Sequence, residues 1–415
     1  MENKQERLIL VAAQKKIHPE SEALESLDEL EELVETAGGQ VLFKVLQRVD
    51  RINAGLYIGS GKVEELKERI QQEGATGVVF DDELSPIQMR NLALALEAKV
   101  MDRTMIILDI FASRALSKEG IIQVEMAQLK YQYSRLTGFG EMLSRQGGGI
   151  GSKGPGEKKL ELDKRHIKVR MEILKNELLE IEKHRQLIRS RREKNSTPVI
   201  AIVGYTNAGK STLLNALCGS DVYVKNQLFA TLDPTTRSAK LPSGGEILVT
   251  DTVGFIRKLP HHLVKAFYST LEEAKYADII LHVMDMSSPH LKTHQTVVQE
   301  TLSKLGVQNI PIVAVYNKVD KAPDIYPKTE WAEHHLEISA KQGFNIDSLL
   351  ACIEEILYSS RKTFKIHVPY NAQEVVAFCH KYGERLQESY ESEYVYLEGY
   401  LPHNKFYKIE PYLVP

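Results

Sequence analysis

Cysteine is scarce in this chain, and its scarcity excludes two kinds of site. Only Cys218, Cys352 and Cys379 occur among 415 residues, and they lie far apart and odd in number. Such spacing provides neither a set of zinc ligands nor a disulfide framework. We therefore expect three ordinary reduced thiols.

Long apolar runs are also missing. No stretch reaches the roughly 18 apolar residues that a membrane-spanning helix needs. The opening residues, MENKQERLIL, hold no apolar segment of secretory length. We expect a cytoplasmic protein without stable membrane insertion, and a peripheral association with a membrane stays open.

A large net charge is absent, but charge is unevenly distributed. The 53 Lys and Arg nearly balance the 56 Asp and Glu, which leaves a net charge of −3. Residues 153–194, however, hold 14 Lys and Arg against 8 Asp and Glu, a local charge of +6. A basic segment in an otherwise acidic chain predicts a polyanionic partner for that segment.

The length is too great for a single hydrophobic core and predicts several domains. Residues 1–115 alternate between short apolar runs and amphipathic segments, which predicts a small α/β domain with a largely parallel sheet. The predicted strands are Leu8–Ala13, Val41–Val49 and Gly77–Phe80, and the predicted helices are Ser21–Thr36 and Ser85–Ala98.

Residues 116–196 indicate an antiparallel helical hairpin with a glycine-rich tip. The amphipathic segments Ile121–Leu136 and Leu160–Arg192 flank Gly138–Glu157, which contains eight glycines and one proline. Glycine at that density should prevent a helix and leave the backbone open. A simple linker beside a solvated, charged helix is the alternative.

Residues 197–360 and 361–415 predict two further domains. The first alternates strongly between strands and helices, with apolar strands at Val199–Val203, Ile279–Met284 and Ile312–Tyr316. The second is predicted to be a small α+β domain, with strands at Lys365–Val368 and Tyr394–Leu401 and a helix at Ala372–Leu386.

A phosphate-binding loop follows the strand Val199–Val203. The sequence GYTNAGKST has the pattern Gly, four residues, Gly-Lys-Ser, between a strand and a helix. Such a loop aims backbone N–H groups at a phosphate, while its lysine contacts the β- and γ-phosphates and its serine is a ligand of Mg²⁺. The predicted phosphate-binding residues are Gly204, Tyr205, Thr206, Asn207, Ala208, Gly209, Lys210, Ser211 and Thr212.

A second glycine-lysine pair, in Tyr57–Leu66, does not match this pattern. Leu56 stands where the first glycine is needed, and Val63 replaces the hydroxyl residue after the lysine. We interpret it as a glycine turn before a helix.

An acidic motif, DTVG, follows the predicted strand Glu246–Val249. Asp251 at a strand end can hold Mg²⁺ through water, and Gly254 can offer its N–H to the γ-phosphate. The sequence therefore predicts Mg²⁺ as the cofactor.

A base-recognition motif, NKVD, follows the predicted strand Ile312–Tyr316. The Asp320 carboxylate can accept both donors of the guanine edge, which adenine lacks, so discrimination by about 10⁴ is attainable. Asn317 can tie this motif to the phosphate loop, and Lys318 can lie along the base. After the strand Leu336–Ile338, backbone N–H groups of Ser339, Ala340 and Lys341 can face the guanine O6. These motifs, in order at the carboxyl ends of parallel strands, predict a GTP site.

The motifs alone leave the catalytic residues open. In LFATLDPTTR a threonine should close over Mg²⁺ and the γ-phosphate, with Thr231, Thr235 and Thr236 as candidates. Phe255 follows DTVG, where many GTPases carry a water-orienting glutamine. Arg237 and Arg257 are weak candidates for an arginine finger. We therefore expect slow hydrolysis unless a partner completes the site.

The motifs GYTNAGKST, FATLDPTTR, DTVGFI, NKVD and SAK, with YIGSGKVEEL and GGGIGSKGPGE before a long basic helix, resemble those of the HflX family of GTPases over essentially the whole chain. The resemblance implies Thr231 as the switch threonine, so that Lys210, Thr231 and Gly254 are catalytic and Ser211, Thr231 and Asp251 serve the metal. It also implies binding to the large ribosomal subunit and its rRNA, with splitting or rescue of stalled ribosomes.

The resulting hypothesis is a GTP hydrolase, slow alone and stimulated by ribosomes, that binds GTP and GDP and is monomeric when free. One alternative is a GTP-regulated RNA-binding or RNA-remodelling protein that acts through its amino-terminal domain and hairpin. Another is a nucleotide-gated adaptor for a protein or membrane partner.

Overall fold

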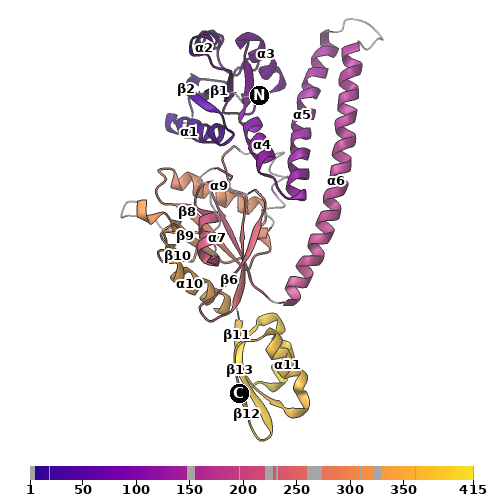
Figure 1. Ribbon diagram of the computed structural model, residues 1–415, viewed down its shortest axis with the longest axis vertical. Helices are drawn as coiled ribbons and strands as arrows, with labels where there is room; N and C mark the ends of the chain where they lie inside the picture. Colours follow the sequence, from indigo (N-terminus) through magenta and orange to yellow (C-terminus); the bar gives the residue numbers. More distant parts are fainter. Residues whose placement is uncertain are drawn as a thin grey trace. The chain divides into compact units, whose positions relative to one another are not determined.

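The chain folds into two compact units of α/β character (Figure 1). The computed structural model describes residues 5–17, 19–146, 155–195, 197–219, 228–229, 232–258, 273–307, 310–321, 329–359 and 361–414. Unit 1 comprises the described residues within Met1–Arg185, Lys225–Asp233 and Ile256–Thr270. Unit 2 comprises those within Gln186–Val224, Pro234–Phe255 and Leu271–Pro415.

The amino-terminal part of unit 1 is an α/β domain with a parallel four-stranded sheet of order β2-β1-β3-β4. The predicted parallel sheet is therefore confirmed. The three predicted strands and both predicted helices form, α2 follows the predicted glycine turn, and β4 and α4 were not predicted. The elements are β1 (Arg7–Lys15), α1 (Glu20–Thr36), β2 (Gln40–Val49), α2 (Ser60–Glu73), β3 (Gly77–Phe80), α3 (Pro86–Leu96), β4 (Lys99–Asp102) and α4 (Arg103–Arg114).

Local sequence explains where several of these elements begin. Ser85 and Gln88 form a capping box at the start of α3, with Pro86 in the first turn. Asp102 caps α4 by accepting the N–H of Met105. The turn expected before a helix at Gly59–Gly61 is present, because Gly59 caps α2.

The hairpin consists of α5 (Lys118–Gln146) and α6 (Pro155–Asn195). Within unit 1, Ile122 and Met126 of α5 pack with Leu174 of α6. Arg170 forms two hydrogen bonds, of 2.6 and 2.9 Å, with the Glu125 carboxylate. Arg185, farther along α6, pairs with Glu119, nearer the start of α5, so the helices are antiparallel as predicted.

The glycine-rich stretch is more helical than the sequence indicated. We expected Gly138–Glu157 to be non-helical, but α5 continues to Gln146 and α6 begins at Pro155; residues 147–154 lie outside the described part. Each isolated glycine costs a helix about 1 kcal/mol relative to alanine. The good helix formers between Gly140 and Gln146 offset that cost, and proline suits a first helical turn.

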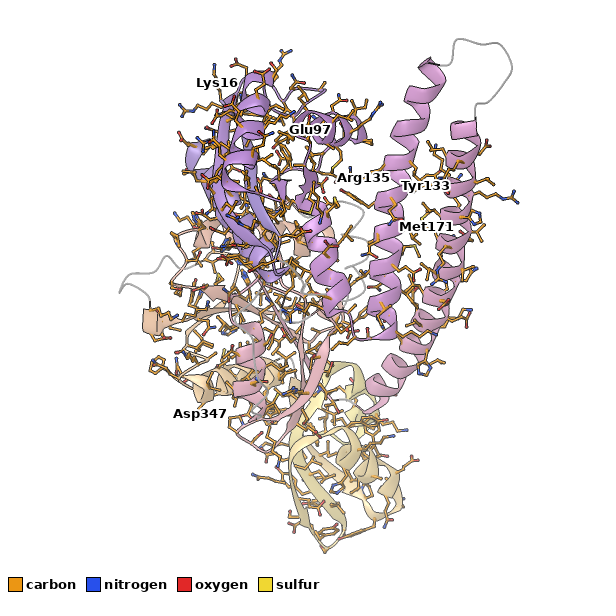
Figure 2. All side chains as sticks on the ribbon, turned by 45° about the horizontal axis from the view of Figure 1, so that its top comes forward. Lys16, Glu97, Tyr133, Arg135, Met171 and Asp347 are labelled. Atoms are coloured by element: carbon orange, nitrogen blue, oxygen red, sulfur yellow. The ribbon has the colours of Figure 1, made fainter. Side chains whose placement is uncertain are left out.

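The hairpin is anchored to the α/β domain at Asp102. Its carboxylate, fully buried, accepts hydrogen bonds from Tyr131 of α5 at 2.8 Å and from Arg135 at 2.7 Å. Figure 2 labels Arg135 on α5 beside the α/β domain. Because the same carboxylate also accepts the N–H of Leu84, one side chain fixes a helix start, a loop and the hairpin.

Unit 2 contains a six-stranded sheet of order β10-β9-β8-β5-β7-β6 in which only β6 is antiparallel to its neighbour. We had not predicted β6, which forms within the threonine-rich segment. The elements are β5 (Val199–Gly204), α7 (Lys210–Cys218), β6 (Thr235–Lys240), β7 (Glu246–Asp251), β8 (Ile279–Asp285), α9 (Leu291–Lys304), β9 (Ile312–Asn317), β10 (His334–Glu337) and α10 (Ile346–Ser359).

The end of unit 2 forms an antiparallel sheet of order β11-β13-β12 with α11 packed against it. Its elements are β11 (Arg361–Pro369), α11 (Gln373–Tyr382), β12 (Glu384–Tyr390) and β13 (Tyr394–Pro402). The predicted helix to Leu386 was too long, because Gly383 follows the last helical residue and Leu386 belongs to β12. The predicted α+β character is confirmed. In the described part of the chain, no helix combines the length and apolarity that a bilayer crossing requires.

Candidate nucleotide-binding site

The phosphate loop joins the end of β5 to the start of α7, in the centre of the six-stranded sheet. A Cβ on Gly204 would collide with the carbonyl of Val283, and one on Gly209 would collide with the amide of Asn317. Gly209 also has a φ of 95°, in the region that favours glycine. Both glycines of the motif are therefore required by their neighbours in this fold.

Not every amide of the loop is directed at a ligand. Thr206 donates its N–H to the carbonyl of Phe255 at 2.8 Å, and Phe255 donates in return to Gly204 at 3.1 Å. These bonds fix the residue after DTVG against the loop. The N–H groups of Lys210, Ser211 and Thr212 lie in the first turn of α7, where the helix offers them no acceptor, so they can serve an anion.

Lys210 lies at the base of the loop with only 7% of its surface exposed. Its Nζ donates to the carbonyl of Tyr205 at 2.8 Å. Burial lowers the pKa of Lys210 to about 8, with the charge of Asp251 opposing that shift and the charge of Lys318 adding to it. A Cβ on Gly254 would lie 2.9 Å from Lys210 Nζ, so the DTVG motif meets the lysine.

The two described residues assigned to the metal are brought together. Ser211 donates its hydroxyl to Asp251 Oδ2 at 2.7 Å, from the first turn of α7 to the end of β7. Hydroxyl and carboxylate oxygens are donors that Mg²⁺ accepts, with phosphate oxygens and water completing its shell. The described residues contain no cluster of three or more His, Cys, Asp or Glu side chains that could hold a metal by themselves. This donor set therefore fits Mg²⁺ bound together with a nucleotide.

The guanine motif is linked to the phosphate loop by Asn317. Its side chain donates to the carbonyl of Ala208 at 2.9 Å and accepts the N–H of Ala340 at 3.0 Å. Lys318 donates to the carbonyl of Asn207 at 2.8 Å and pairs with Asp285 at 2.7 Å. The expected tie between NKVD and the loop is therefore present, and it extends to the SAK motif.

The Asp320 carboxylate is fixed by the motif that follows it. Ser339 donates its hydroxyl to Asp320 Oδ1 at 2.6 Å, and this bond holds the pKa of Asp320 below its usual range. The N–H of Ala340, next to Ser339, is donated to Asn317 Oδ1 at 3.0 Å. The charged, oriented carboxylate is suited to accept two parallel N–H donors.

Several candidates from the sequence lie elsewhere. Thr231 lies outside the described residues. Thr235 and Thr236 belong to β6, where Thr236 shares a hydrogen bond of 2.9 Å with Thr250. Arg237 donates to Asn215 of α7 at 3.2 Å. Arg257 pairs with Glu22 and Glu25, each at 2.9 Å.

Some residues around the loop were missed in the sequence. Asp285 ends a strand, as Asp251 does, and that position was an available signal. The ring of Tyr205 stacks on His294 of α9 with centroids 3.8 Å apart, a contact that no local pattern indicates. His282 is buried within β8, where burial and the charge of Lys210 lower its pKa to about 3 and keep the ring neutral.

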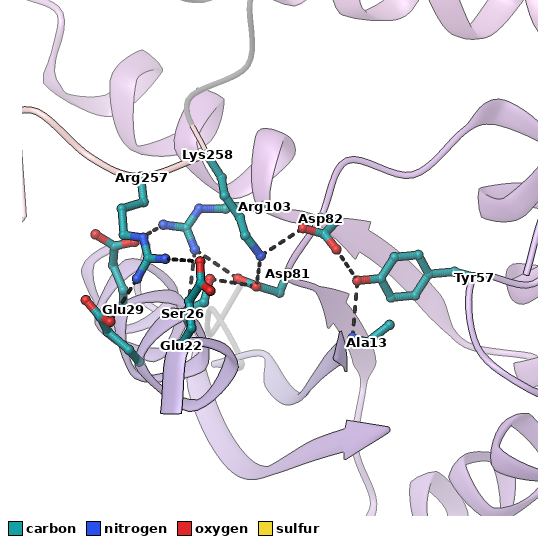
Figure 3. A network of polar contacts seen from close by, with 11 residues as sticks. Ala13, Glu22, Ser26, Glu29, Tyr57, Asp81, Asp82, Arg103, Arg257 and Lys258 are labelled. Carbon is teal, nitrogen blue, oxygen red and sulfur yellow. Dashed lines mark hydrogen bonds and ion pairs between the residues drawn. The ribbon is translucent and has the colours of Figure 1, made fainter. Parts of the chain in front are cut away.

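Residues 256–258, which follow Phe255, belong to unit 1, where they join a polar network (Figure 3). Lys258 pairs with Asp81 and, at 2.8 Å, with Asp82. Asp81 also accepts hydrogen bonds from Arg103 at 2.9 Å and from Ser26 at 2.7 Å. Burial alone would raise the pKa of Asp81, but the charges of Arg103 and Lys258 hold it below its usual range.

Comparisons with known proteins agree with these motifs. Family models described as GTP-binding GTPase N-terminal, GTP-binding GTPase Middle Region and 50S ribosome-binding GTPase match residues 24–112, 114–192 and 199–318. A GTPase HflX of Lacrimispora saccharolytica is 52% identical over 403 residues, covering 97% of this chain and 95% of that protein. Another, of Caldanaerobacter subterraneus subsp. tengcongensis, is 51% identical over 388 residues, covering 94% of this chain and 89% of that protein. A crystal structure of a GTP-binding protein from Sulfolobus solfataricus with GDP is 26% identical, with a TM-score of 0.46, and covers 85% of this chain and 98% of that protein.

Proposed function

Because this chain belongs to the HflX family of GTPases and is a GTP hydrolase of the P-loop class, we propose that its GTP cycle drives the splitting or rescue of stalled ribosomes through the large subunit. The match of residues 199–318 to a 50S ribosome-binding GTPase supports the partner. The basic stretch of α6 supports contact with rRNA, because phosphate contacts need exposed Lys and Arg rather than a particular sequence.

One observation carries the nucleotide assignment: the side chain of Asn317 joins the phosphate loop to the SAK motif, at 2.9 and 3.0 Å. The residues assigned to the triphosphate and those assigned to the base are therefore joined through one side chain. In our assignment Gly204 to Thr212 hold the phosphates, while Asp320, supported by Ser339, reads the base.

Other residues of the chain are assigned to metal binding and to stabilising the charge of the phosphates. Ser211 and Asp251 would hold Mg²⁺, which when bound neutralises charge on the β- and γ-phosphates. Lys210 would add a second positive charge, and the N–H of Gly254 would face the γ-phosphate. Thr231 is assigned to close the site as part of the first switch segment, the residues LFATLDPTTR at positions 228–237. Preorganised charge of this kind supplies most of the catalysis of phosphoryl transfer.

Water activation has no evident residue in the described site. Phe255 cannot orient water, and Arg237 and Arg257 are engaged by other side chains. We therefore assign completion of the site to the ribosome. An arginine finger supplied by a partner accelerates related enzymes by about 10³-fold or more, which sets the scale of the expected stimulation.

Single-turnover hydrolysis with and without purified large subunits tests this function. We expect a rate increase of at least about a hundredfold with large subunits. Sedimentation with GTP, GDP and a non-hydrolysable analogue should show the tightest ribosome binding with the analogue. Equal hydrolysis rates in both conditions would remove the ribosome from the mechanism.

The basic hairpin also supports a second candidate, a GTP-regulated RNA-remodelling protein. In that case residues 1–196 alone should remodel RNA, and large subunits should leave the hydrolysis rate unchanged. Co-sedimentation that is lost at high salt is common to both candidates, so the rate measurement decides between them.

A further inference from the structure

The carboxylate of Asp233, in the first switch segment, accepts hydrogen bonds at the start of α5. Asp233 Oδ2 accepts the N–H of Leu116 at 2.9 Å and the N–H of Ser117 at 2.8 Å. The hydroxyl of Ser117 donates to Asp233 Oδ1 and accepts the N–H of Gly120 at 2.9 Å. A residue 116 positions away in the sequence thus helps to cap the first helix of the hairpin.

The helix start is shaped for that carboxylate. A helix amino terminus presents unpaired N–H groups and a partial positive charge, which an anion stabilises. A Cβ on Gly120 would collide with Asp233 Oδ1 and would lie 3.1 Å from Ser117 Oγ. A larger side chain at position 120 would therefore displace Asp233 from the helix start.

The segment that carries Asp233 is embedded in unit 1. Leu228, Phe229 and Leu232 are each at most 5% exposed. The ring of Phe229 packs edge-on against Phe111 of α4, with centroids 4.7 Å apart. Asp233 therefore belongs to a packed segment and is not an isolated surface contact.

The same segment leads directly into the nucleotide site. Pro234 is the only residue between Asp233 and β6, and Thr235, the first residue of β6, pairs with Asp251. Asp251 is the carboxylate assigned to Mg²⁺. Because one residue separates Asp233 from β6, a displacement of the start of β6 when GTP binds would be transmitted to Asp233 and would weaken its hold on the hairpin.

We propose that Asp233 is a positioning residue that latches the hairpin base to the first switch segment, so that GTP releases the start of α5 and GDP keeps it closed. The proposal rests on the proposed role of residues 228–233 as the first switch and requires nothing of the ribosome. Asp233 touches no reacting atom; it acts through Ser117 and α5. By thermodynamic linkage, a partner that holds α5 away from Asp233 favours the GTP-bound form to the same extent.

Hydrogen exchange of residues 116–123 tests the latch in the full chain. We compare the wild type and Asp233→Ala, each saturated with Mg²⁺ and either GDP or a non-hydrolysable GTP analogue. In the wild type, exchange should be about tenfold faster with the analogue, which is the change expected when a charge-assisted hydrogen bond is lost. In Asp233→Ala, exchange should be equally fast with both nucleotides.

A second variant breaks the latch from the helix side. Gly120→Ala should also abolish the nucleotide-dependent difference, although alanine alone would favour the helix and slow exchange. Gly61→Ala is the matched control, because Gly61 lies in the first turn of α2 and its added Cβ would meet nothing within 4 Å. That control should leave the wild-type difference at residues 116–123 intact.

Nucleotide affinity is measured on the same samples by displacement of a fluorescent GDP. If Asp233→Ala or Gly120→Ala binds both nucleotides normally yet keeps the wild-type difference in exchange, the latch is wrong. A wild type that binds the analogue but exchanges at the same rate as with GDP also overturns it. A wild type that binds neither nucleotide contradicts the site assignment itself.

Discussion

At the scale of single residues, the pKa of Lys210 makes nucleotide binding depend on pH. In the free protein burial lowers that pKa to about 8, so about half of the lysines are neutral at pH 8. A bound triphosphate favours the charged form and raises the pKa. Binding should therefore take up about half a proton at pH 8, and affinity should fall as the pH rises through 8.

Calorimetry in two buffers of different ionisation enthalpy measures this uptake. Below about pH 7 the lysine is charged with and without nucleotide, so uptake through it should vanish there. Guanosine, which lacks phosphates, is the matched ligand control and should show no uptake at pH 8. Identical heats for GDP in both buffers at pH 8 would contradict the assignment of Lys210.

Asp320 gives a prediction about specificity. Asp320→Asn should weaken GDP binding by about a hundredfold or more and shift preference to xanthosine diphosphate, because the amide donates where guanine also donates. Ser339→Ala, which removes the 2.6 Å bond to Asp320, should weaken GDP binding only about fivefold. Competition with fluorescent GDP measures both, and an Asn variant that still prefers guanine would show that another group reads the base.

At the scale of elements, the segment after DTVG stabilises β3 through Asp81. Because the folded pKa of Asp81 is lowered, its ionised form contributes stability above the unfolded value of about 4. That contribution is lost as the pH falls through the folded pKa. Lys258→Met removes one of the two cations beside Asp81, so the pKa of Asp81 in the folded protein should rise. The amides of β3 should then lose their protection from hydrogen exchange at a higher pH than in the wild type.

Hydrogen exchange of residues 77–81, corrected for the intrinsic effect of pH, measures that loss. We expect the midpoint of the loss to move up by about half a pH unit or more. Lys258→Arg retains the charge and should behave as the wild type. The idea fails if Lys258→Met and Lys258→Arg lose protection at the same pH.

Much of the element pattern and the site could be predicted because local chemistry determines them. The glycines of the phosphate loop, the apolar strand before NKVD and the capping residue Ser85 act over a few residues. Strand β6 could not be predicted in this way. Its residues, TTRSAK, are polar and mostly half-exposed, and they become a strand through pairing with β7.

The contacts that could not be predicted join residues far apart in the sequence. Asp233 meets Ser117 across 116 positions, and Lys258 meets Asp81 across 177. Neither pair follows a helical or strand period, so nothing local announces it. Gly120 alone does not announce the contact either, because Gly61 occupies the first turn of α2 with nothing within 4 Å of its added Cβ.

At the scale of the whole molecule, charge is separated along the chain. Residues 153–194 carry +6 while the net charge is −3, so the rest of the chain carries −9. Such a distribution attracts RNA to one element and repels it elsewhere. If α6 contacts rRNA, removing its lysines and arginines should weaken ribosome binding whatever the local RNA sequence. The dependence of that binding on salt concentration should also decrease.

A triple variant of α6, with Lys159, Arg165 and Lys175 changed to Gln, tests this. All three side chains are exposed, so the fold should be retained. Sedimentation with large subunits and the GTP analogue should weaken. The slope of log affinity against log salt should fall by about one for each side chain that binds an rRNA phosphate in the wild type.

Exposed Lys275, Lys292 and Lys304 in unit 2 offer a control with the same change in charge. If the rRNA contacts are made by α6, changing these three lysines to Gln should leave the slope as in the wild type, because charges that bind no phosphate release no counterions from the RNA. If both triple variants reduce the slope equally, attraction follows net charge alone. The hairpin would then have no particular place at the ribosome.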